Sequence, residues 1–145
     1  MIQYNSITNI LNQLYKYSNT FLHIRNDITL PIPAFSTIEK DIYGRLVPTI
    51  IINMTLIPND DNVLAHIISH EWGHHASKHL LPIQEDAREF VEHAHHIQQK
   101  ENEADLFAAK FITDFKYNIS PIIEFFKSHP VDIKNRIHIL THLTI

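Results

Sequence analysis

The stretch that decides the fold is His70-Glu71-Trp72-Gly73-His74, an H-E-x-x-H pattern. Residues four apart on an α-helix lie one above the other, so the imidazoles of His70 and His74 can bind a single metal ion. Glu71 lies one step round the helix, where its carboxylate can reach a metal-activated water. The pattern therefore predicts zinc-dependent hydrolysis, provided that the segment is helical and that a third ligand exists.

The sequence before this pattern is typical of a helix start. Asn59-Asp60-Asp61-Asn62 can cap free N–H groups and places negative charge at the positive end of the helix dipole. Apolar residues then recur at helical spacing, at Leu64, Ile67 and Ile68. We therefore expect a helix from this cap to about Leu80, with the metal-binding pattern in its middle.

The third ligand is expected in the segment Glu101-Asn102-Glu103-Ala104-Asp105. No Gly or Pro occurs in residues 84–118, which predicts one long helix or two helices joined by a short break. Glu101 and Asp105 share a face of that helix. One carboxylate can complete a zinc site, and the other can accept a hydrogen bond from the far nitrogen of a ligating imidazole. We assign the first role to Glu101 and the second to Asp105, with Glu103 as the alternative ligand.

The remaining segments predict an α+β fold, mostly helical, with a small sheet before the metal-binding helix. The length of 145 residues predicts a single domain, 1–145. The strand region around 50–54 is expected to be an edge that holds a peptide by strand addition. The other expected elements are a helix after Asn5 and Ser6, a short strand at 21–25, an irregular loop or hairpin bracketed by Pro31, Pro33 and Gly44, one or two strands at 45–57, and two C-terminal helices that begin at Ser120-Pro121 and His129-Pro130.

Composition excludes several kinds of site and partner. The chain has no cysteine, so His and carboxylate are the strong zinc ligands that remain. A formal net charge of -4 argues against nucleic acid as the main partner. The N-terminal residues lack the pattern of a signal peptide, and no apolar stretch is long enough to span a bilayer. We therefore expect a cytoplasmic protein without an integral membrane segment.

Three segments together resemble the HtpX-type and CaaX-prenyl endopeptidases, which belong to the gluzincin group of zinc metallopeptidases. Residues 67–74, with His79 five positions on, are similar to the motif helix of that family. Residues 101–108 are similar to its E-x-E-A-D-x-x-A segment, and Ser128-His129-Pro130 with Arg136-Ile137 to its S/T-H-P-x-x-x-x-R-I segment. The resemblance implies a zincin-like metallopeptidase domain that binds one zinc ion per chain and cleaves peptide or protein substrates.

The resemblance also implies catalytic roles. Glu71 would act as the general base, while His129 and Arg136 would lie near the site as donors to the developing oxyanion. The chain departs from the family in three respects. It has no membrane helices, only residues 75–100 lie between His74 and Glu101, and one extra residue precedes Arg136.

Three other interpretations of these motifs stay open. Residues 103–109 are also similar to the E-A-x-x-F-A-A segment of the ImmA/IrrE peptidases, whose usual role is to cleave a repressor. The chain would alternatively be a zinc-bound regulatory or interaction module that cleaves little, or a helical protein without metal. The cluster His93, His95 and His96 is interpreted as a solvated helix face, with a second metal site as the alternative.

Overall fold

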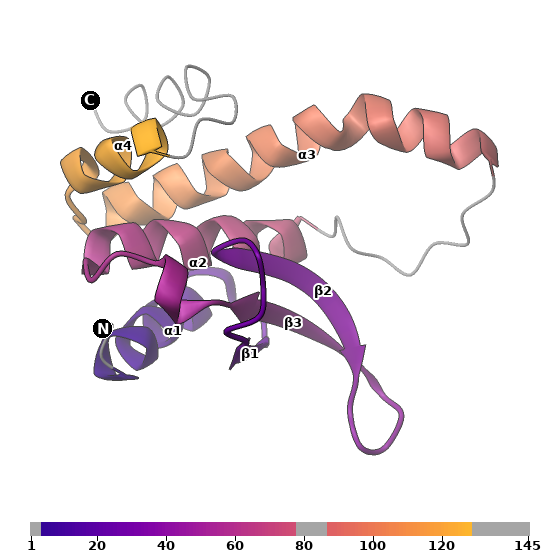
Figure 1. Cartoon of the computed structure of the whole chain (residues 1–145), viewed down its shortest axis with the longest axis horizontal. Helices are drawn as coiled ribbons and strands as arrows, with labels where there is room; N and C mark the ends of the chain where they lie inside the picture. The colour runs from indigo at the N-terminus through magenta and orange to yellow at the C-terminus, as the bar shows by residue number, and fades with distance from the viewer. Residues whose placement is uncertain (1–3, 78–86, 129–145) are drawn as a thin grey trace.

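The computed structural model describes the backbone of residues 4–77 and 87–128, and the side chains of residues 5–77 and 99–128. These residues form an α+β fold with four α-helices and a three-stranded sheet, which confirms the fold class expected from the sequence (Figure 1). In chain order the elements are α1 (Tyr4–Ser18), β1 (His23–Asn26), β2 (Ala34–Lys40), β3 (Leu46–Ile52), a 3-10 helix η1 (Met54–Leu56), α2 (Asp61–Ala76), α3 (Ala87–Asp114) and α4 (Ile119–Ser128).

Helix α2 lies at the centre of the fold and contacts α1, α3, α4, β2 and β3. Ten of its sixteen residues are buried, as expected for a helix that is apolar on most sides. Asp60 is its N-cap, and its carboxylate accepts hydrogen bonds from the backbone N–H groups of Asn62 and Val63. The predicted helix start is therefore confirmed. The predicted end near Leu80 lies outside the described residues.

The sheet has the strand order β1-β3-β2, with β1 parallel and β2 antiparallel to β3. The expectation of an edge at residues 50–54 is wrong, because Ile50 and Ile52 belong to the central strand β3 and are 0% and 2% exposed. After Ile52 the chain leaves the sheet and forms η1. The run of apolar residues fills a strand with a neighbour on each side, which is where such runs are stable. The edges of the sheet are β1 and β2.

Of the two alternatives for the region between the predicted strand segments, a loop or a hairpin, the structure has the hairpin, and residues 34–40 form its first strand, β2. Strands β2 and β3 pair from Ala34↔Ile52 to Lys40↔Leu46, and the turn between them projects away from the helices (Figure 1). Gly44 has a φ of 78° in this turn, a backbone conformation that favours glycine.

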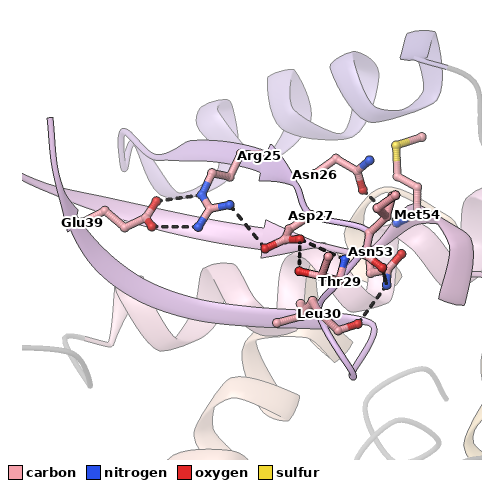
Figure 2. A network of polar contacts seen from close by, with 9 residues as sticks. Arg25, Asn26, Asp27, Thr29, Leu30, Glu39, Asn53 and Met54 are labelled. Carbon is pink, nitrogen blue, oxygen red and sulfur yellow. Dashed lines mark hydrogen bonds and ion pairs between the residues drawn. The ribbon is translucent and has the colours of Figure 1, made fainter. Parts of the chain in front are cut away.

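A network of polar contacts ties the sheet and its connecting loop together (Figure 2). Arg25 on β1 donates from Nε and Nη2 to the two carboxylate oxygens of Glu39 on β2, over 2.9 Å each, and so joins the two edge strands across β3. The side-chain nitrogen of Asn53 donates to the backbone carbonyls of Ile28 and Leu30. These bonds hold the loop between β1 and β2 against the end of β3.

The terminal helices of the described residues pack on both sides of α2. Trp72 of α2 donates from its indole nitrogen to the hydroxyl of Ser18, at the end of α1, over 2.6 Å. Helix α4 begins two residues before the predicted Pro121, because the side chain of Asn118 accepts from the backbone of Ser120. The helix expected at His129-Pro130 lies outside the described residues. Among the described helices, none combines the length and the apolar run that crossing a bilayer needs.

Candidate metal centre

Three predicted ligands come together where α2 and α3 lie side by side (Figure 1). One ligand atom each from His70, His74 and Glu101 lies within 4.8 Å of the others. Nε2 of His70 lies 3.0 Å from Oε2 of Glu101, and Nε2 of His74 lies 3.2 Å from Oε1 of the same carboxylate. Each oxygen of Glu101 therefore faces one imidazole.

The other ring nitrogen of His70, Nδ1, is hydrogen bonded to Asp105. Nδ1 of His70 donates to Oδ1 of Asp105 over 2.7 Å, and both side chains are less than a tenth exposed. This bond sets the ring orientation of His70 and leaves Nε2 facing Glu101 and His74. Glu103, the alternative ligand, is exposed and does not belong to the cluster that the described residues form.

The charges around His70 favour a cation. Burial by itself lowers the pKa of His70, but its hydrogen bonds with Asp105 and Glu101 outweigh this effect and raise the pKa from 6.5 to about 10. Burial raises the pKa of Glu101, yet its bonds with His70 and His74 outweigh that and hold it well below its usual range. Carboxylate groups therefore lie beside the imidazole nitrogens of the cluster, and their negative charge favours the binding of a cation there.

The donor set and its spacing suit a divalent metal ion such as zinc. Two imidazole nitrogens and one carboxylate are a known three-residue zinc ligand set, which leaves a fourth position open. The separations of 3.0 and 3.2 Å involve the two different oxygens of Glu101, and the three ligand atoms lie within 4.8 Å of one another, close enough for one ion to contact all three. The side chain of Glu101 is 46% exposed, so the cluster is accessible from that side.

Gly73 explains how the two helices come close enough for this arrangement. A Cβ atom at Gly73 would lie 3.0 Å from Cβ of Phe107, 3.1 Å from Cα of Ala104 and 3.2 Å from the carbonyl oxygen of Ala104. A side chain at this position would require α3 to move by a few tenths of an ångström, so glycine lets α2 lie this near to the backbone of α3. A glycine inside a helical pattern is a signal for close packing, but this role of Gly73 was not among the predictions from the sequence.

Glu71 contacts a residue of the sheet, Ser36, that was not predicted from the sequence. The hydroxyl of Ser36 on β2 is hydrogen bonded to carboxylate oxygen Oε2 of Glu71 and lies 3.0 Å from its backbone oxygen. Glu71 is close enough to His70 that its charge contributes to the raised pKa of that residue. No local pattern in the sequence could have indicated Ser36, because the two residues are 35 positions apart.

Two further histidines of α2 have structural contacts. Nε2 of His75 donates to the backbone carbonyl of Thr49 on β3 over 3.0 Å, and burial lowers the pKa of His75. His66 is buried, with its ring stacked on that of His70 and edge-on to Phe126. His75 therefore links α2 to the sheet, and His66 packs against a predicted metal ligand.

Several predicted positions cannot be placed. His79, His129 and Arg136 lie outside the described residues, as do the side chains of the cluster His93, His95 and His96. No protein-family model, curated protein or solved structure matches the chain. A function must therefore be inferred from the cluster on α2 and α3 and from its surroundings.

Proposed function

We propose that the chain is a zinc-dependent endopeptidase with a zincin-like fold, in which His70, His74 and Glu101 hold one zinc ion. The observation that carries this proposal is the convergence of these three ligand atoms within 4.8 Å, with Asp105 on the far nitrogen of His70. Zinc bound in such a site polarises a carbonyl group and lowers the pKa of a water to about 7. The order of the motifs, H-E-x-x-H and then a Glu on a later helix, supports a place in the gluzincin group.

Glu71 is the proposed general base. It follows the ligand His70 directly, and its carboxylate is held in place by Ser36. Glu71 would accept one proton as the oxygen of a water molecule attacks the carbonyl carbon of the peptide bond. It would return that proton to the amine nitrogen when the carbon–nitrogen bond breaks.

The free edge of β2 is the proposed binding site for the peptide. Within the described part of the chain, strand β2 pairs with β3 alone, and its residue Ser36 contacts Glu71. An extended peptide that adds to this edge would be bound through main-chain hydrogen bonds. It would therefore lie beside the proposed base, Glu71, irrespective of the sequence of the peptide. This edge takes the place of the one expected at residues 50–54.

His129 and Arg136 remain the proposed oxyanion donors, on the resemblance to the HtpX-type and CaaX-prenyl endopeptidases alone. Replacing either residue should then lower the rate of cleavage and leave the zinc content unchanged. If a variant such as His129→Ala cleaves as fast as the wild type, the replaced residue is not an oxyanion donor.

The first test measures bound zinc and peptide cleavage in the purified protein. We expect one zinc per chain by elemental analysis, and cleavage of an unfolded protein or of a peptide library. Glu71→Gln should keep the zinc and lower the rate by about 100- to 10,000-fold, because it removes the base and leaves the ligands in place. The matched control is Glu103→Gln, which neutralises an exposed carboxylate on α3 and should change neither zinc content nor rate.

The outcomes separate the possible functions. A protein that holds no zinc when micromolar zinc is present would contradict the proposal as a whole. A protein that holds zinc and cleaves no peptide would favour the regulatory module instead. If Glu71→Gln cleaves as fast as the wild type, Glu71 is not the base.

A further inference from the structure

We propose that Ser36 is a positioning residue for Glu71, which ties the base to the strand that would carry the substrate. This inference rests on the proposed function for its kinetic consequence. Ser36 is 7% exposed, and its hydroxyl reaches both Oε2 and the backbone oxygen of Glu71. That backbone oxygen lies inside α2, where the N–H group four residues on is its regular donor. The proton of the Ser36 hydroxyl is therefore available to the carboxylate.

The place of Ser36 in the sheet makes it a firm anchor. Ser36 pairs with Ile50 of the central strand, and Ile50 is completely buried. Further along the two strands, the double hydrogen bond between Arg25 and Glu39 joins β2 to β1 across β3. A donor held in this way limits where the carboxylate of Glu71 can lie.

Serine is an unusual residue for this position. Side chains alternate between the two faces of a strand, so Ser36 shares its face with Ala34 and Ile38. Burial of a hydroxyl on an otherwise apolar face costs free energy unless the group is hydrogen bonded. The bond to Glu71 provides that partner for the buried hydroxyl of Ser36.

A free glutamate side chain occupies several rotamers and loses roughly 1.5 to 2 kcal/mol of conformational freedom when it is fixed. A general base must lie within about 3 Å of the proton that it accepts, and an error of 1 Å can cost about 100-fold in rate. Because β2 is also the proposed substrate edge, Ser36 would hold Glu71 at a set position relative to the bound peptide. The alignment then exists before the substrate arrives.

The test compares Ser36→Ala with Thr37→Ala, its neighbour on the same strand, whose side chain points to the opposite face of the sheet. In crystal structures of the two zinc-loaded proteins, Glu71 should leave its position in Ser36→Ala and keep it in Thr37→Ala. With a cleaved peptide, Ser36→Ala should lower kcat by about 10- to 100-fold, with KM and zinc content close to those of the wild type. Ser36→Thr keeps the hydroxyl and should restore most of kcat.

Two results would overturn the inference: an unmoved Glu71 in Ser36→Ala, or an equal loss of kcat in Ser36→Ala and Thr37→Ala. If Ser36→Ala does not fold, Ser36→Cys keeps the size of the side chain with a weaker donor, and the same comparison applies. The crystallographic comparison does not depend on activity. A zinc-loaded wild type that cleaves nothing would therefore defeat the proposed function, while the position of Glu71 would still decide the role of Ser36.

Discussion

At the scale of single residues, His70 is the most constrained member of the candidate site. Its two ring nitrogens face carboxylates from α3, and its ring stacks on His66. The spacing of the motif was enough to predict that His70 and His74 lie on one side of a helix. The spacing could not show that Nδ1 of His70 is hydrogen bonded to Asp105, because that bond depends on how α3 packs against α2.

Asp105→Ala should weaken zinc binding by about 10- to 100-fold, since the residue that orients His70 is lost while all three ligands remain. The measurement is competition for zinc against a chelator of known affinity. Asn102→Ala on the same helix serves as the control, because Asn102 is not part of the ligand cluster. Equal affinities for Asp105→Ala and the wild type would show that Asp105 does not orient the ligand.

At the scale of elements, the helices were easier to predict than the sheet. The start of α2 follows from Asp60 and its neighbours, which are local signals. The strand β2 was placed only within a loop or hairpin, because the prolines and Gly44 around it indicated turns. The position of β2 at the edge of the sheet depends on its pairing with β3 from Ala34↔Ile52 onward. No local sequence pattern predicts the order of strands in a sheet.

The chain has two glycines, and they should respond differently to alanine. Gly73→Ala should cost about 1 to 3 kcal/mol of stability and weaken zinc binding as well, because the new Cβ pushes α2 away from Ala104 and Phe107. Gly44→Ala meets no atom within 4 Å and should cost about 1 to 2 kcal/mol through backbone strain alone, with zinc binding unchanged.

Urea unfolding of the zinc-free proteins gives the stability of each glycine variant, and chelator competition gives its zinc affinity. If Gly73→Ala binds zinc as tightly as Gly44→Ala does, the close approach of the helices is not what brings the ligands together.

At the scale of the whole molecule, α2 joins the sheet to the helical layer. His75 bonds to the backbone of β3, Ser36 of β2 reaches Glu71, and His70 and His74 face α3. The sequence predicted one apolar stripe along this helix, at Leu64, Ile67 and Ile68, whereas ten of its sixteen residues are buried. Which neighbouring element each polar residue of α2 contacts depends on tertiary packing, which no local pattern in the sequence indicates.

If the chain binds zinc as proposed, removal of the metal should lower the free energy of unfolding, since the proposed ligands lie on two helices of the folded chain. With free zinc at about 100 times its dissociation constant, the stabilisation is about 2.7 kcal/mol. Thermal unfolding with and without a chelator measures it. His74→Ala should unfold at the same temperature in both conditions, and a persistent difference would show that zinc stabilises the protein elsewhere.

Because the proposed ligands are divided between α2 and α3, the candidate metal site can form only at a certain stage of folding. Residues 75–100 separate His74 from Glu101, so no local fragment of the chain contains the whole site. If the chain binds zinc as proposed, the third ligand becomes available only after the two helices have docked, so full capture of the metal comes late in folding. The rate at which the native protein exchanges its zinc should therefore report how often α3 separates from α2.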